Sequence, residues 1–176
     1  LSLTHKKQFT KNGISPFLGP SFDQNGILKL LQNNNNIKFK KIKKNINKKI
    51  VELLLSGKIL GIFRGRAEYG PRSLGNRSII ADPRKLMSKT KINHLIKRRD
   101  WFMPFAPAII EEKYEDYFEN KGKSLYMQTS PLASRYFKNL ARAGVHIDGS
   151  SRVQKVEKSS NRDFWEVINN FGLNTN

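Results

Sequence analysis

Four arginines crowd into one short stretch of the chain, at Arg64, Arg66, Arg72 and Arg77, with Glu68 as the one acidic residue among them. Three glycines and a proline separate these charged residues. A guanidinium group is planar and permanently charged, so it can hold an oxyanion through two parallel hydrogen bonds. Glycines let a backbone approach a ligand closely, and its N–H groups add to anion binding. The stretch therefore indicates a site for phosphate or a phosphoanhydride; an arginine-rich surface turn is the alternative.

The elements that must position this stretch follow from hydrophobic periodicity. An apolar run at 59–63 predicts a buried strand that ends directly before the arginines. Ligands of α/β proteins commonly bind at strand ends, which fits an oxyanion site there. Apolar spacing predicts a preceding helix over 46–54, with Gly57 just after its C-terminus. Asp23 predicts the cap of a shorter helix, which the asparagines at 33–36 end.

The second half of the chain completes the pattern of one mixed α/β domain. A helix is predicted over 86–97, with Ile92, Leu95 and Ile96 pointing inward. Residues 120–144 are weakly patterned and predict a surface loop, with a flexible lid as the alternative. The remaining predictions are a loop or strand in 1–24, a charged surface connection at 38–44, an extended segment at 101–110, a short acidic helix at 114–118, a turn at 145–149, a strand at 152–156 and a last helix at 164–171.

Composition narrows the class of protein. The chain has 176 residues, enough for one domain with its own core. It has no cysteine, no visible signal peptide and no apolar run near the roughly 20 residues that a membrane-spanning helix needs. We therefore expect a cytoplasmic location, no disulfide and no membrane partner.

The net charge of +19 favours polyanionic partners. Lysine and asparagine are both abundant, especially at 33–36 and 38–49, and an AT-rich coding bias would produce the same composition. The lysine-dense segment also lacks a series of interleaved aromatic residues on which bases could stack. A solvated basic face is favoured there, and nucleic-acid binding stays possible but is not favoured.

Several familiar chemistries find no support in the sequence. It has no Walker A motif and no GxGxxG after a strand. The three histidines, His5, His94 and His146, lack metal-ligand spacing, so we expect no metal held by protein ligands. A Ser-His-Asp set would have to use Ser78, His146 and Asp148, and nothing like a nucleophile elbow surrounds Ser78.

Longer ordered motifs point to a family. They are Gly65 through Ser78, Ala81-Asp82-Pro83-Arg84, Pro104-Phe105-Ala106-Pro107 and His146 through Gln154, preceded by Pro16-Phe17-Leu18-Gly19-Pro20. Together they resemble the C-terminal domain of the NodU/CmcH/TobZ carbamoyltransferase family. The resemblance implies a YrdC-like twisted sheet with flanking helices in a single domain. That domain would occupy 25–176, behind a leading segment 1–24, and we expect it to be truncated at its C-terminus.

The resemblance also implies a function. The corresponding family domain activates carbamoyl phosphate with ATP and Mg²⁺, which gives a carbamoyl-adenylate and releases pyrophosphate and phosphate. An N-terminal actin/hexokinase-like domain, absent here, then passes the carbamoyl group to a hydroxyl of a small-molecule acceptor. The chain would thus be the activating part of a carbamoyltransferase. The alternative is a YrdC-like RNA-binding or structural module without catalysis.

The site residues that the resemblance and the charges suggest come from four segments of the chain. Preorganised cations stabilise charge that develops on a transferred phosphoryl group. Arg66, Lys91 and Arg152 are the catalytic candidates. The substrate- and nucleotide-binding candidates are Arg66, Glu68, Arg72, Asn76, Arg77, Ser78, Lys91, Arg99, His146 and Arg152. Glu68 is expected to orient an arginine, and His146 either bonds the carbamoyl group or phosphate or is structural.

Two departures from the family pattern concern this site. Family members often carry Glu-x-x-Arg before Pro-Phe-Ala-Pro, whereas this chain has Asp100 and Met103 at those two positions, with Arg98 or Arg99 as replacements for the arginine. The family also continues into an Asn-Thr-Ser-Phe-Asn segment that is not present here. Arginines that converge on a concave pocket favour the enzyme, whereas arginines spread over a convex face favour RNA binding.

Overall fold

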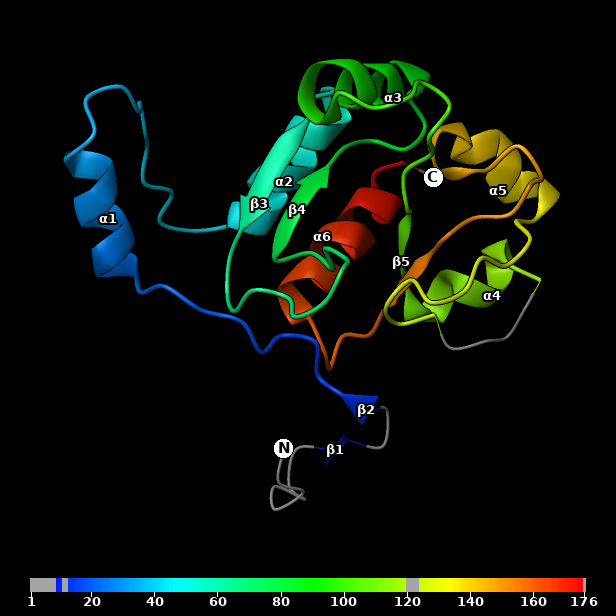
Figure 1. Cartoon of the computed structure of the whole chain (residues 1–176), viewed down its shortest axis with the longest axis horizontal. Helices are drawn as coiled ribbons and strands as arrows, with labels where there is room; N and C mark the ends of the chain where they lie inside the picture. Colours follow the sequence, from blue (N-terminus) through cyan, green and yellow to red (C-terminus); the bar gives the residue numbers. More distant parts are fainter. Residues whose placement is uncertain (1–8, 11–12, 120–123, 176) are drawn as a thin grey trace.

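The computed structural model describes residues 9–10, 13–119 and 124–175 (Figure 1). His5 and residues 120–123, which the predictions above include, lie outside the described residues. The helices are α1 (Gln24–Gln32), α2 (Ile46–Leu55), α3 (Leu86–Lys91), the π-helix η2 (Ile92–Lys97), the 3₁₀ helix η3 (Glu111–Lys113), α4 (Tyr114–Tyr117), α5 (Arg135–Leu140), the 3₁₀ helix η4 (Arg142–Gly144) and α6 (Arg162–Leu173). The strands are β1 (Phe9–Thr10), β2 (Gly13–Ile14), β3 (Leu60–Phe63), β4 (Arg77–Ile80), β5 (Ala108–Ile110) and β6 (Gln154–Val156). Within the described residues, no helix has the length and apolar character to cross a bilayer.

The described strands form three two-stranded sheets. β3 and β4 are antiparallel, with Leu60 opposite Ile80 and Phe63 opposite Arg77. β5 and β6 are parallel, and β1 pairs with β2. Short strands and helices follow one another along the chain, which confirms the predicted mixed α/β class. The strands that the structure describes do not join into the one twisted sheet that the sequence predicted.

Two apolar clusters form the core. One packs Val51 and Leu54 of α2 against Val167 of α6, with the β3–β4 pair partly covering it. The other joins β5, α4 and α5, with Val153 just before β6, around Tyr114 and Phe137. Figure 1 shows α6 running between the β3–β4 pair and the β5–β6 pair. Each fully buried apolar side chain of this size contributes about 1.5–3 kcal/mol relative to exposure, so these clusters are the main source of stability.

The predicted helices at both ends of the domain are confirmed. Asp23 caps α1 and accepts a hydrogen bond from the backbone N–H of Gly26. Gly57 follows α2 with a φ of 80°, a conformation that glycine adopts without strain. α6 ends at Leu173, one residue beyond Gly172. The charged connection at 38–44 is exposed, as predicted.

The strand before the arginines is less buried than predicted. Burial alternates along β3, and the side chain of Phe63 is 59% exposed. Leu60 packs against the cluster formed by α2 and α6, whereas Phe63 lies exposed further along the strand. Because β3 pairs antiparallel with β4, the arginine stretch is the connection of an antiparallel hairpin rather than a loop at the end of a parallel strand.

The helix predicted over 86–97 changes its geometry halfway. It is an α-helix up to Lys91 and a π-helix from Ile92. The wider π turn moves later residues out of the 3.6-residue spacing, because each hydrogen bond spans five residues. Ile92 is buried as predicted, but Leu95 and Ile96 are exposed and the prediction for them was wrong. Asn93 takes an inward position instead.

The weakly patterned segment belongs to the core where the structure describes it. Residues 124–144 include α5, and Leu125, Ala133 and Phe137 are buried. The backbone N–H of Ala133 donates to the carbonyl of Gly149. The predictions of a surface loop or a lid were therefore wrong for 124–144, because small residues such as Ala133 fill core space without giving an apolar period.

The hairpin connection is held together by one carboxylate. Oε1 of Glu68 accepts hydrogen bonds from the backbone N–H groups of Leu74, Asn76 and Arg77, at 2.7, 2.8 and 3.2 Å. Burial raises the pKa of the Glu68 carboxyl, but the hydrogen bonds outweigh burial and leave the pKa below its ordinary value. Glu68 thus orders the loop backbone.

The leading segment Pro16–Pro20 lies along the outside of this connection. The N–H of Gly19 donates to the carbonyl of Ala67, and the N–H of Ala67 donates to the carbonyl of Pro20, each at 2.9 Å. A side chain at Gly19 would meet Ala67, since an added Cβ would lie 2.8 Å from the Cβ of Ala67. The motif around Gly19 therefore belongs to the loop structurally, although it is distant in sequence.

Gly75→Ala should destabilise the fold strongly. Gly75 has a φ of 111°, and an added Cβ would lie 2.5 Å from Cδ1 of the buried Phe164 ring. We expect the free energy of unfolding to fall by about 2–4 kcal/mol, from backbone strain and overpacking together. Urea denaturation measures this. Gly61→Ala is the matched control, because nothing lies within 4 Å of a Cβ at Gly61; a loss as small as in the control would contradict the packing seen here.

Glu68→Gln should reduce both stability and its pH dependence. Because the pKa of Glu68 is lower in the folded chain, its carboxylate stabilises the fold above the ordinary glutamate pKa of about 4.3, and this contribution is lost as the pH falls through the folded value. We expect a loss of about 1–3 kcal/mol at pH 7, since hydrogen bonds to a charged acceptor are replaced by weaker ones.

Urea unfolding from pH 3 to pH 7 checks this prediction. The difference between wild type and Glu68→Gln should shrink towards pH 3. Glu115→Gln, which removes an exposed carboxylate on α4, serves as the control. A difference that stays constant with pH would show that the charge of Glu68 does not hold the loop.

Candidate functional site

A large cleft lies between the β3–β4 hairpin and the β5–β6 half of the fold. Its volume is about 940 Å³. β4 and β5 both line it, and Phe164, Val167 and Phe171 of α6 form an apolar floor. Five cationic side chains lie on its walls: Arg72, Lys89, Lys97, Arg99 and Arg152. The cleft therefore combines apolar surface with an excess of positive charge.

Half of the binding residues predicted from the sequence meet at this cleft. They are Arg72, Ser78, Arg99, His146 and Arg152. Arg72 and Ser78 come from the hairpin, Arg99 follows η2, and His146 and Arg152 precede β6. Segments more than 70 residues apart in the sequence (72 and 146) thus supply one concave surface.

Arg99 is fixed in place by neighbours. Its Nε donates to Oδ1 of the buried Asn93 at 2.7 Å. Its guanidinium carbon lies 4.6 Å from the centre of the Phe105 ring, within cation–π range. Nδ2 of Asn93 donates in turn to the carbonyls of Trp101 and Met103. Burial lowers the pKa of Arg99, but a guanidinium stays charged at any relevant pH.

His146 belongs to a short hydrogen-bonded chain. Its Nδ1 lies 2.9 Å from Oγ of Ser150, whose hydroxyl donates to Oδ1 of Asp148 at 2.7 Å. Because that hydroxyl has one proton, it accepts from His146, so Nδ1 carries the proton. The backbone N–H and the hydroxyl of Ser150 both donate to Oδ1 of Asp148, and these two hydrogen bonds lower the pKa of the Asp148 carboxyl. The set of Ser78, His146 and Asp148 is not assembled as a catalytic triad, since Ser150 lies between His146 and Asp148 in the hydrogen-bonded chain.

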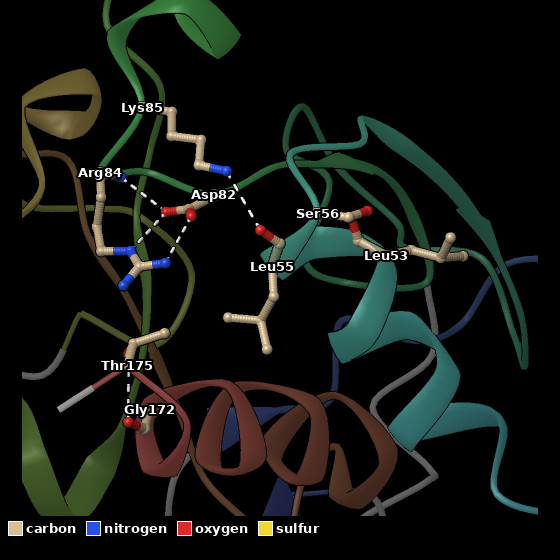
Figure 2. Close-up of polar contacts among 8 residues, drawn as sticks. All are labelled: Leu53, Leu55, Ser56, Asp82, Arg84, Lys85, Gly172 and Thr175. Carbon is tan, nitrogen blue, oxygen red and sulfur yellow. Dashed lines mark hydrogen bonds and ion pairs between the residues drawn. The ribbon is translucent and has the colours of Figure 1, made fainter.

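An ion pair between the buried Asp82 and the half-buried Arg84 lies beside β4 at the wall of the cleft. Asp82 is 1% exposed, and its two carboxylate oxygens accept from Nε and NH2 of Arg84 at 2.9 and 2.8 Å (Figure 2). Burial raises the pKa of Asp82, and the hydrogen bonds from Arg84 lower it further than that, so the net pKa lies below its ordinary value. Next to this pair, Nζ of Lys85 donates to the carbonyl of Leu55 at the end of α2.

Two predicted residues line a separate, smaller pocket. Arg66 and Asn76 border a space of about 330 Å³ beside Arg64, Asn161 and the start of α6. NH2 of Arg66 donates to the carbonyl of Leu18 at 2.7 Å, in the leading segment. Nδ2 of Asn76 donates to the carbonyl of Arg66. The structure thus separates Arg66 from Arg152, with which it was predicted to act.

The other predicted residues face neither pocket. NH1 of Arg77 donates to the carbonyl of Arg64 at 2.6 Å, and its guanidinium lies 3.7 Å from the centre of the Phe63 ring. Glu68 binds the loop backbone, as described above. Lys91 ends α3 with an exposed side chain, so its predicted convergence on the arginines is not seen. The catalytic roles of Arg66 and Lys91 stay predictions.

Sequence reasoning missed four residues that shape the cleft. Lys89 and Lys97 line it directly. Asn93 holds Arg99, and Nε2 of Gln154 donates to the carbonyl of Leu74, which ties β6 to the hairpin connection. Gln154 was part of a quoted motif, and Asn93 is a polar residue beside Ile92 on a helix that packs inward. Both signals were present in the sequence.

Comparison with known proteins gives consistent matches. An uncharacterized protein of Methanocaldococcus jannaschii is 34% identical over 159 residues, which cover 89% of this chain and 26% of that protein. Nodulation protein NolNO of Sinorhizobium fredii is 39% identical over 127 residues, covering 70% of this chain and 19% of its own length. Nodulation protein NolO of Bradyrhizobium diazoefficiens is 39% identical over 125 residues, covering 69% and 23%.

The chain spans about a quarter or less of the length of these relatives. Residues 51–176 also match the family described as Carbamoyltransferase C-terminus. That match includes the hairpin, the cleft walls and α6. Since it covers well over half of the sequence, the chain belongs to the carbamoyltransferase C-terminus family.

Proposed function

We propose that this chain carries the activating site of a carbamoyltransferase. In this reaction, carbamoyl phosphate, ATP and one water give carbamoyl-adenylate, pyrophosphate and phosphate. Water cleaves the bond between the carbamoyl group and its phosphate, which releases phosphate and leaves carbamate. A carbamate oxygen then bonds to the α-phosphorus of ATP while the bond to the β-phosphate breaks and pyrophosphate leaves. The carbamoyl group would then pass to a hydroxyl of a small-molecule acceptor, at a site supplied by the remainder of a longer polypeptide such as the relatives have.

The excess positive charge of the cleft carries this proposal. Its walls hold five cationic side chains, whereas its two acidic ones, Asp82 and Asp148, are already engaged by Arg84 and Ser150. Two phosphorylated substrates bring at least four negative charges together, and such charges are stabilised by cations that are fixed before the reaction. A concave cationic surface also favours substrate binding over the alternative of RNA binding on a convex face.

The cleft residues suit different parts of the substrates. Arg72 and Arg152 would neutralise phosphate oxygens, and Arg99 would do so from a position held by Asn93 and Phe105. The apolar floor from α6 offers a surface for an adenine ring. In the tautomer argued above, Nε2 of His146 is left as an acceptor, suited to an N–H of the carbamoyl group. Mg²⁺ would enter with ATP, held by its phosphates.

Arg152→Gln should abolish most of the activation step. The assay is exchange of labelled pyrophosphate into ATP, dependent on carbamoyl phosphate, in the natural full-length polypeptide that contains this sequence. Loss of one preorganised cation at a phosphoryl-transfer site costs about 100- to 1,000-fold in rate. We expect Arg72→Gln to act in the same direction, with a larger effect on the apparent affinity for the substrates.

Lys58→Gln is the matched control, because Lys58 is exposed and lies outside both pockets. It removes the same charge and should leave exchange unchanged. Absence of carbamoyl-phosphate-dependent exchange in the wild type would overturn the proposed function. Exchange that survives Arg152→Gln and Arg72→Gln but is lost in Arg66→Gln would instead place the site at the smaller pocket.

A further inference from the structure

The segment between the leading residues and α2 stands apart from the rest of the fold. Residues 24–45, here called the basic arm, comprise α1 and the connection to α2. None of them is buried, and all are exposed except the half-buried Leu28 and Leu31. Figure 1 shows α1 well away from the two sheets and α6. The arm therefore contributes little to the core that holds the domain together.

α1 is amphipathic although none of its residues is buried. Its apolar residues, Ile27, Leu28, Leu30 and Leu31, recur at helical spacing, and Leu30 is 67% exposed. A helix of nine residues is marginal in water by itself, since most helical stability comes from packing of the apolar face. Exposed Ile37, Phe39 and Ile42 continue the apolar positions beyond the helix.

The charge of the basic arm restricts what could cover these apolar residues. The arm has six lysines and no aspartate or glutamate, and the next acidic residue is Glu52. Its lysines are Lys29, Lys38, Lys40, Lys41, Lys43 and Lys44. A second copy of this chain, with a net charge of +19, would repel the arm. The partner must therefore be anionic and must also accept aliphatic side chains.

A lipid surface meets both conditions better than a nucleic acid does. Lysines alone can bind the phosphates of a nucleic acid, but base recognition uses stacked aromatics and arginine forks on base edges, and the arm has one aromatic residue and no arginine. Phosphate contacts would also leave the exposed aliphatic residues of the arm uncovered. Basic amphipathic segments bind anionic membranes by inserting aliphatic side chains while lysines remain at the headgroups. The arm alternates lysine with Ile37, Phe39 and Ile42 in this way.

We propose that the basic arm attaches this protein peripherally to anionic lipid surfaces. The aliphatic residues of α1 enter the interface, and the lysines of 38–44 lie against the phosphate headgroups. The absence of a membrane-spanning sequence, from which we expected no membrane partner, concerns insertion and not this mode of attachment. The proposal is independent of the activation chemistry, because the arm lines neither pocket.

Co-sedimentation with vesicles tests the proposal on the 176-residue chain. Vesicles of phosphatidylcholine with 30 mol% phosphatidylglycerol should bind the protein at about 0.1 M salt, and binding should weaken as salt rises. A variant with Lys38, Lys40, Lys43 and Lys44 changed to Gln should lose about 1,000-fold in partitioning, since each lysine contributes about 1 kcal/mol at an anionic surface. Leu30→Gln should lose about 10-fold without a change in charge.

The control variant removes the same charge elsewhere: Lys58, Lys113, Lys138 and Lys158, all exposed on the body of the fold, are changed to Gln. It should keep most of the binding. Absence of vesicle binding, or equal losses in the arm and body variants, would overturn the proposal. So would binding that ignores Leu30→Gln and is fully displaced by polyuridylate, since that would show charge-driven nucleic-acid binding.

Discussion

One carboxylate oxygen orders the arginine-rich part of this molecule. Oε1 of Glu68 accepts from three backbone N–H groups, and this fixes the connection between β3 and β4. Four arginines lie on or beside that connection, and their like charges repel one another. Glu68 is the single acidic residue among them. Because Glu68 binds backbone and not a guanidinium, the arginines remain available for other acceptors.

The arginines form two groups according to what their guanidinium groups contact. Arg66 and Arg77 donate to backbone carbonyls of the leading segment and of the hairpin itself, including those of Leu18 and Pro20. Such bonds hold the segment Pro16–Pro20 against the connection and keep both side chains out of the large cleft. Arg72 lines the cleft with Arg99 and Arg152. The loop thus uses chemically identical side chains both to build its structure and to face the cleft.

Much of the fold could be predicted because its signals are local. The apolar period of α2, the cap of α1 at Asp23 and the end of α6 near Gly172 are all visible in the sequence. The π turn at Ile92 was not, since its spacing departs from the period that such predictions use. Nor was the core role of 124–144, where buried small residues such as Ala133 gain their meaning from neighbours far along the chain.

The candidate site shows the same difference between what local sequence patterns predict and what long-range contacts decide. Residue types and the family resemblance identified Arg72, Arg99 and Arg152, which the fold brings to one cleft. The different position of Arg66 depends on a hydrogen bond to Leu18, 48 residues away, and no local pattern encodes it. Asn93 was missed because its function is exerted through Arg99. Sequence thus indicates which charges a protein has, while long-range hydrogen bonds decide which of them can meet a ligand.

Two kinds of positive charge follow from this division, and they suit different partners. The cleft gathers cations on the walls of one concavity, with Arg99 held by Asn93, so it favours a small anion. The basic arm holds lysines on exposed and partly irregular backbone, outside both pockets. A surface of that kind favours an extended anionic partner that adapts to it. The net charge of +19 therefore combines a specific cationic site with a general one.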